Sequence, residues 1–228
     1  MEDKMPDKKR ITFYVDGFNF YYGLRRSETA DKNWGNAYWI NIVKLFQGFI
    51  SNDEVIEKVI YFTATPLNSQ KSSRQSAFLN ANKILNTKQF EIVRGKYLEK
   101  HIQCPYCNSD ISKPEEKKTD VNISIRMISD CINKSTDSLA LVSADSDLIP
   151  PLELIKENFP SMKIKVLFPP SNYSNDIAHL LAAWNKKPIL MKKSYKRFEN
   201  SIMNDCININ SKKYEIPKEW KSKQTKFL

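Results

Sequence analysis

The sequence predicts an α/β domain with a mainly parallel sheet of about five strands and helices on both faces, followed by a C-terminal helical extension. First, short apolar segments rich in β-branched and aromatic residues alternate with segments whose apolar residues recur at helical spacing. Second, 228 residues are enough to bury a substantial core. Third, residues 186–228 lack the alternation, so we expect the domain to span residues 9–185 and residues 186–228 to form a basic extension.

Five segments are expected to be strands, because each is apolar, rich in β-branched or aromatic residues and bounded by turn residues. In chain order they are residues 10–17, 55–66, 90–100, 137–144 and 162–170. Helices are expected at residues 38–50, 68–88, 119–134, 148–159 and 174–185. The helix at 119–134 is apolar on most faces and is therefore expected to be buried, with Thr119 as its N-cap and Asp120 in its first turn.

An inserted, cysteine-containing loop is expected at residues 101–118. Its segment "HIQCPYC" places His101, Cys104 and Cys107 at a spacing found in half of a zinc site. A complete tetrahedral site needs a fourth ligand, which Cys206 or a second copy of the chain could provide. A turn with reduced thiols is the favoured interpretation, and Zn²⁺ is the alternative.

The net charge of +10 is concentrated near the C-terminus. From Lys186 onward there are twelve Lys or Arg residues and four Asp or Glu residues. A solvated tail and a basic arm that binds a polyanion both explain this excess. Charge alone does not separate the two interpretations.

No apolar run approaches the roughly 18–20 residues that span a bilayer, so no membrane partner is expected. The first ten residues contain no apolar segment of the kind found in signal peptides. The four cysteines do not make a disulfide framework in a chain of this length. We therefore expect a cytoplasmic location, and a homo-oligomer is compatible with the sequence.

Four acidic residues are expected to face one another. Asp16 ends the first strand, Asp145 and Asp147 end the fourth, and Asp120 begins a helix. Because the carboxyl ends of parallel strands meet at one edge of a sheet, these carboxylates converge if the two strands are neighbours. Such a cluster needs a cation, and oxygen ligands favour Mg²⁺ or Mn²⁺. Each acid taken alone could instead be a turn residue, a helix cap or a partner of a helix dipole.

Three segments, "FYVDGFNFYYG", "KKTDVNISIRMISD" and "LALVSADSDLIPPLELIKE", occur in this order and together resemble the NYN domain family. More narrowly, they resemble its LabA-like branch, formerly DUF88, within the PIN-like nuclease superfamily. The resemblance covers roughly residues 10–185. It implies a Rossmann-like, three-layer fold and metal-dependent cleavage of RNA.

The resemblance also implies roles for individual residues. It matches Asp16 to the first acid, Asn19 to the polar residue of the following turn, Asp120 to the middle acid with Thr119 beside it, and Asp145 and Asp147 to the paired acids, with Ser143 at the same strand end. Hydrolysis of a phosphodiester needs an activated water and a Lewis acid, and one or two Mg²⁺ or Mn²⁺ ions supply both. We expect Asp16, Asp120 and Asp145 to be metal ligands. Asp147 is expected to bind a second ion or orient the water, and Asn19 to hydrogen-bond a ligand carboxylate or the scissile phosphate.

Several further residues are candidates for contact with nucleic acid, most naturally RNA. Lys117, Lys118 and Arg25 could approach the phosphates, with Thr119 and Ser143 near the same place, although lysine and arginine at such positions are usually only solvated. Tyr21, Tyr22, Trp34 and Trp39 could stack on bases, but core packing is favoured for most of them.

Other functions explain the sequence less well. A phosphatase of the haloacid dehalogenase type would place an Asp-x-Asp pair at the first strand, whereas the pair here follows the fourth. Some relatives of the LabA-like branch are named as small-molecule oxygenases, but no flavin or haem motif is visible. The stronger alternative is a non-catalytic PIN-like module that binds RNA or a protein. Because all four matched acids are present, catalysis is favoured.

Overall fold

The computed structural model describes residues 8–104, 106–107, 109–209 and 211–224. Its centre is a six-stranded sheet in the order β3-β2-β1-β6-β7-β8, in which every neighbouring pair is parallel. The strands are β1 (Lys9–Asp16), β2 (Glu54–Thr63), β3 (Phe90–Arg94), β6 (Ser138–Val142), β7 (Lys163–Phe168) and β8 (Ile189–Leu190). The predicted α/β class and parallel sheet are confirmed, with one strand more than expected.

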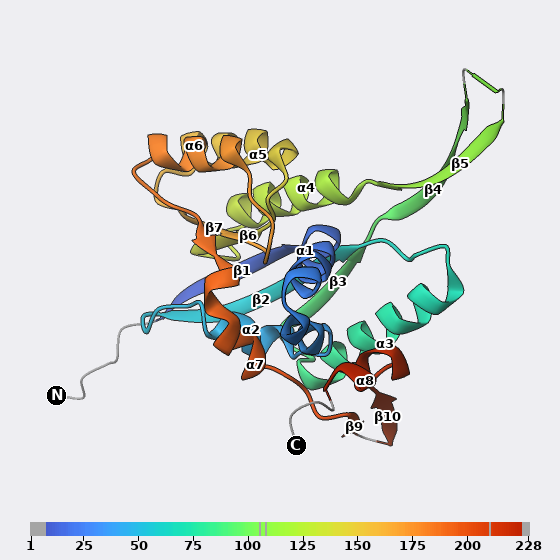
Figure 1. Cartoon of the computed structure of the whole chain (residues 1–228). Helices are drawn as coiled ribbons and strands as arrows, with labels where there is room; N and C mark the ends of the chain where they lie inside the picture. Colours follow the sequence, from blue (N-terminus) through green and yellow to red (C-terminus); the bar gives the residue numbers. More distant parts are fainter. Residues whose placement is uncertain (1–7, 105, 108, 210, 225–228) are drawn as a thin grey trace.

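Helices cover both faces of the sheet and give three layers (Figure 1). One face carries α4 (Thr119–Ile132), α5 (Ile149–Asn158) and α6 (Asn175–Ala183). The other carries α1 (Gly17–Ala30), α2 (Ile42–Gln47), α3 (Ser69–Leu85), α7 (Tyr195–Glu199) and α8 (Lys218–Gln224). Short 3-10 helices join these elements at η1 (Lys32–Tyr38), η2 (Ser146–Leu148) and η3 (Met191–Ser194).

The central strand β1 is buried on both sides. Ile11, Phe13 and Val15 belong to the core beneath α1, α2 and α3, whereas Tyr14 belongs to the core beneath α4, α5 and α6. Successive side chains of a strand point to opposite faces, so a strand covered on both sides is apolar throughout. This burial explains why the segment appears in the sequence as a continuous apolar run.

Helix α4 is tied to the sheet by a buried polar network. The Tyr14 hydroxyl donates to Asp130 Oδ2 at 2.8 Å, and the same carboxylate accepts from Arg126 Nε at 3.0 Å. Arg126 Nη1 also donates to Glu91 of β3 at 2.6 Å. Because Asp130 satisfies a buried hydroxyl and is itself paired, the network fixes α4 against β1 and β3.

The pairing of β1 with β6 sets the edge at which the acids meet. Val15 lies opposite Val142, so the next residues along, Asp16 and Ser143, emerge together at the carboxyl edge. At the other end of the pair, the Arg10 guanidinium and backbone N–H both donate to Asp137, just before β6. The register is therefore anchored at both ends.

The structure differs from the prediction at residues 90–118, where a strand at 90–100 and an inserted loop at 101–118 were expected. β3 ends at Arg94, and β4 (Lys96–Gln103) pairs antiparallel with β5 (Asp110–Lys117) in a hairpin that extends away from the sheet (Figure 1). Gly95 marks the change of direction, because its N–H donates to Thr63 O at 2.9 Å and ends the pairing with β2. A Cβ on Gly95 would lie 2.7 Å from Thr119 Oγ1, so the chain passes α4 closely there.

The sequence predicted a helical C-terminal extension, but the extension also contains strands. It adds β8 to the main sheet and forms a second hairpin from β9 (Cys206–Ile209) and β10 (Lys212–Glu215). Phe198 and Trp220 belong to the same core cluster as β1. These strands are too short for their periodicity to be recognised in the sequence. The domain boundary at residue 185 stays a prediction.

The expectation that α4 is buried is wrong for one of its faces. Ile123 and Met127 are fully buried, but the side chains of Val121, Ile125 and Ile132 are 58%, 63% and 62% exposed. The apolar residues of α4 are therefore not all covered by neighbouring elements. The buried face is the one that positions Asp120.

Gly17, the first residue of α1, packs closely against β2, and substitution of this glycine tests how tightly the two elements pack. A Cβ on Gly17 would lie 2.4 Å from Tyr61 Cε1 and 2.6 Å from Phe62 O. We expect Gly17→Ala to lower the free energy of unfolding, measured by urea denaturation, by about 1–3 kcal/mol, because a backbone atom cannot move aside easily. Gly48→Ala is the control. There a Cβ would first meet the flexible Arg197 side chain at 3.1 Å, and we expect a change below about 1 kcal/mol. Equal stability of the two variants would contradict this account.

Candidate metal centre

Asp16 lies at the end of β1 and caps the N-terminus of α1. Its side chain is only 4% exposed. Oδ1 accepts from the Asn19 backbone N–H at 2.9 Å, and Oδ2 accepts from the Ser143 hydroxyl at 2.9 Å. Because both carboxylate oxygens are held, the orientation of Asp16 is fixed by its own helix and by the neighbouring strand end.

Ser143 connects Asp16 with the acids that follow β6. Its hydroxyl donates to Asp16 and accepts from the Asp145 backbone N–H at 3.1 Å. Asp145 in turn caps η2, because its Oδ1 accepts from the Asp147 N–H at 3.0 Å. One fully buried hydroxyl therefore fixes Asp16 and the start of the Asp145 loop relative to each other.

Asp120 enters the cluster from the first turn of α4, as predicted. The N-cap is Lys118, in a left-handed conformation with φ 74°, so Thr119 is the first helical residue rather than the cap. Asp16, Asp120 and Asp145 each offer a carboxylate oxygen, and these atoms all lie within 4.8 Å of one another. Three of the four predicted acids are therefore brought together. The Asp147 side chain is exposed and lies outside this group.

The electrostatics of the cluster are compatible with a bound cation. The pKa of Asp120 is raised above its ordinary value, first by burial and then by the negative charges of Asp145 and Asp147. Carboxylates that raise one another's pKa bind a proton or a cation more readily than isolated ones. The donor set consists of oxygen atoms alone, which fits Mg²⁺ or Mn²⁺ better than a softer metal.

Asn19 helps to shape the site through its backbone and side chain. Its N–H binds Asp16, and its Oδ1 accepts from the Ala144 N–H at 3.3 Å. Asn172, in the loop after β7, donates from Nδ2 to the Asn19 carbonyl oxygen at 2.8 Å and also to Asn19 Oδ1. Sequence reasoning missed Asn172. Its position just after a predicted strand was the available signal.

The residues expected to contact nucleic acid are divided between surface and interior. Lys117, Lys118 and Arg25 are exposed, and the two lysines directly precede the helix that carries Asp120. Thr119 is 5% exposed and Ser143 is fully buried, so neither presents surface to a strand. The expectation of direct contact is corrected for these two, because both side chains pack inside the site.

The expected zinc knuckle lies near the tip of the β4–β5 hairpin. The side chain of His101 is outside the described residues. The Cys107 thiol lies 2.9 Å from the Ser109 hydroxyl, and this contact lowers the pKa of Cys107. Among the residues that the structure describes, the acidic cluster is the group of three side chains placed to hold a metal. Zinc binding at Cys104 and Cys107 therefore stays a prediction.

The fold and the site together define the class of protein. A three-layer fold with a parallel sheet and acids at the carboxyl edge of its central strands is PIN-like. The NYN domain model matches residues 10–176, and the chain belongs to the NYN domain family. The match is to the family as a whole and is compatible with the LabA-like branch.

Two individual proteins are similar to this chain. One is the 6-hydroxy-3-succinoylpyridine 3-monooxygenase HspA of Pseudomonas putida, 28% identical over 203 residues that cover 74% of this chain and 62% of that protein. The chain thus spans less than two thirds of that relative's length. The other is a crystal structure of a protein of unknown function from Vibrio parahaemolyticus, with a TM-score of 0.49 and 19% identity, covering 77% of this chain and 91% of that one. Within the described ranges, every helix is too short or too polar to cross a bilayer.

Thermal unfolding tests the metal centre without any assay of activity. In EDTA we expect Asp145→Asn to raise Tm by about 1–3 °C, because one charge of a mutually repelling group is removed while the bond from the Asp147 N–H is retained. Added Mn²⁺ should raise the Tm of the unmodified protein and leave that of the variant nearly unchanged. Asp53→Asn, an exposed acid before β2 at the opposite edge of the sheet, is the control. An equal response of both variants to Mn²⁺ would place the ion elsewhere.

Proposed function

We propose that this protein is a metal-dependent ribonuclease that hydrolyses phosphodiester bonds of RNA with Mg²⁺ or Mn²⁺. The observation that carries the proposal is the approach of Asp16, Asp120 and Asp145 to within 4.8 Å at the edge of a parallel sheet. Membership of the NYN family supports nuclease-type activity in general. Charges gathered in this way cost stability, so a role in catalysis accounts for them better than a role in packing.

In this proposal Asp16, Asp120 and Asp145 hold the ion. A bound Mg²⁺ or Mn²⁺ would polarise the phosphoryl oxygens and lower the pKa of a water molecule. Asp147, exposed beside the three acids, orients the attacking water or binds a second ion. Asn19 holds the Asp16 carboxylate through its N–H.

The substrate is approached from the exposed side of the cluster. Lys117 and Lys118 lie at the base of the hairpin, directly before α4, where they can contact backbone phosphates. Arg25 lies further along α1 and lines a separate cavity. A cytoplasmic setting, expected from the cysteines, belongs to the same proposal.

Two alternatives are separated by a direct assay. One is a non-catalytic module that binds RNA or a protein. The other is a small-molecule activity of the kind that the name of the Pseudomonas putida relative states for that protein. The presence of every matched acid favours hydrolysis over the first. The acidic, oxygen-only ligand set favours it over the second.

The assay measures cleavage of labelled single-stranded RNA, structured RNA and single-stranded DNA, each with Mg²⁺, Mn²⁺ or EDTA. We expect metal-dependent cleavage of RNA that falls at least about 100-fold in Asp145→Asn, because a ligand charge is lost. Asp53→Asn should retain activity. Salt-sensitive RNA binding without cleavage would support the binding module. Cleavage that persists in Asp145→Asn would contradict the assigned site.

Ser143→Ala tests how the acids are positioned. The variant removes the hydroxyl that donates to Asp16 and accepts from the Asp145 N–H. We expect a roughly 10- to 100-fold loss of activity that is partly recovered at high Mn²⁺, as for other groups that orient metal ligands. The dependence of the rate on Mn²⁺ concentration measures this. An unchanged dependence would show that the hydroxyl does not position the ligands.

A further inference from the structure

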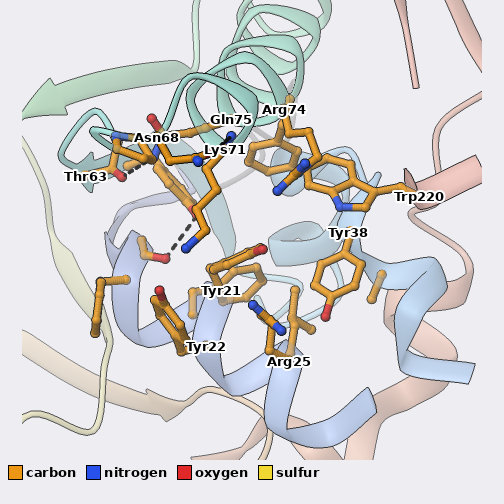
Figure 2. A pocket seen from close by; sticks show the side chains of 18 of the residues that line it. Tyr21, Tyr22, Arg25, Tyr38, Thr63, Asn68, Lys71, Arg74, Gln75 and Trp220 are labelled. Carbon is orange, nitrogen blue, oxygen red and sulfur yellow. Dashed lines mark hydrogen bonds between the residues drawn. The ribbon is translucent and has the colours of Figure 1, made fainter. Parts of the chain in front are cut away.

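A cavity of about 290 Å³ is lined by residues of α1 and α3, among others (Figure 2). It is bounded by α1, η1, α3 and α8 and by the carboxyl end of β2. Gly17 directly follows β1, Thr63 ends the neighbouring strand β2, and both residues line the cavity. The cavity therefore opens at the same edge of the sheet as the acidic cluster.

The walls of the cavity are largely aromatic. Tyr38 and Trp220 stack with ring centroids 5.6 Å apart, and Tyr21 packs against Tyr38 at 5.7 Å. Tyr21 and Tyr22 are only half-buried, so part of each ring is available to a ligand. The sequence had suggested both as possible stacking residues.

Trp34 and Trp39, the other two candidates for stacking, are core residues. They are 4% and 0% exposed. Trp34 packs against Tyr195 and Phe198, and Trp39 Nε1 donates to Asn204 O at 2.9 Å. Of the four residues that the sequence suggested for stacking, Tyr21 and Tyr22 are therefore the two with part of the ring exposed.

Three cations line the same cavity. Arg25 and Lys71 are exposed at its rim on α1 and α3, and Arg74 is paired with Glu219 of α8 at 2.7 Å (Figure 2). Aromatic faces beside exposed cations suit a planar ring that carries a negative group.

Gln75 also lines the cavity, and its side-chain amide is held by the end of β2. Gln75 Nε2 donates to Thr63 Oγ1 at 2.9 Å and to Ala64 O at 3.1 Å. Gln75 Oε1 is buried and has no hydrogen-bond partner among the described residues. Because this oxygen is closed off from the cavity, contact with a ligand falls to the aromatic rings and the cations of the walls.

The cavity and the acidic cluster share the start of α1. Gly17 directly follows Asp16, and its carbonyl oxygen lies 3.4 Å from the Tyr61 hydroxyl in the cavity wall. Phe18 is 44% exposed and packs on Tyr22 at 4.4 Å. A ligand in the cavity is thus separated from the metal centre by little more than the first turn of α1.

We propose that this cavity binds one nucleotide of a single-stranded RNA next to the phosphodiester held at the acidic cluster. The base packs against Tyr21, and the phosphate of the same nucleotide meets Lys71 and Arg25. The volume suits one nucleotide and excludes a base that is still stacked in a duplex. The connection with cleavage rests on the proposed function, whereas nucleotide binding stands apart from it.

The test is therefore a binding measurement, made in EDTA on protein that carries Asp145→Asn so that nothing is cleaved. Calorimetry with the four ribonucleoside 5′-monophosphates and with a short single-stranded oligoribonucleotide should show binding to both. We expect Tyr21→Ala and Lys71→Ala each to weaken it about five-fold or more. The matched controls are Tyr173→Ala and Lys83→Ala. Tyr173 lies after β7 and Lys83 in α3, and both are exposed and outside the cavity. Each control should change the dissociation constant less than about two-fold.

Each outcome has a definite meaning. Absence of binding, or binding that neither variant weakens, overturns the proposal. Lys71→Ala alters an exposed side chain, so its result stands even if Tyr21→Ala unfolds the protein. If benzoate binds more tightly than every nucleotide, the proposal of a nucleotide as the ligand is overturned, and the cavity is a site for small aromatic acids. Nucleotide binding to a protein that cleaves no RNA would retain the cavity's assignment and reject the nuclease.

Discussion

The parallel pairing of β1 with β6 is the contact on which the acidic cluster depends. It places Val15 opposite Val142, so that Asp16 and Ser143 leave the sheet side by side. A slip of one residue would turn every side chain of β6 to the opposite face and would separate Ser143 from Asp16. The Arg10–Asp137 contact at the other end of the pair resists such a slip. The register is therefore as important to the site as the acids themselves.

The third acid is positioned in a different way, by packing rather than by strand pairing. α4 is held through the buried side chains of Ile123 and Met127 and through the bond between Tyr14 and Asp130. Its first turn then projects Asp120 toward two carboxylates, and the pKa of Asp120 is raised first by burial and then by repulsion from neighbouring acids. The core thus maintains an arrangement of charges that is unfavourable without a cation. Local unfavourable features of this kind, supported by the rest of a fold, are typical of functional sites.

The sequence predicted the parts of this protein that follow from local patterns. Asp16 and Asp145 could be recognised because each stands where an apolar strand stops, and Asp120 because it begins a helix. The β4–β5 hairpin was missed because the single Gly95 was not recognised as a boundary between two strands, and because residues 110–117 are almost entirely polar. Asn172 was missed because its contact with Asn19 is made between distant segments. Such contacts depend on tertiary structure and leave no periodic signal.

The C-terminal region shows how a distant segment can complete a site. The basic excess after residue 185 suggested either a solvated tail or an arm for a polyanion. In the folded chain, α8 instead brings Trp220 against Tyr38, and Glu219 pairs with Arg74 of α3. This part of the extension therefore forms a wall of the cavity beside α1. Because Asp16 caps α1, and α1 carries Tyr21 and Arg25 along its cavity-facing side, this one helix links the acidic cluster to the aromatic wall. The position of a ligand in the cavity relative to the metal centre is consequently set by α1 and by the close contact of Gly17 with β2.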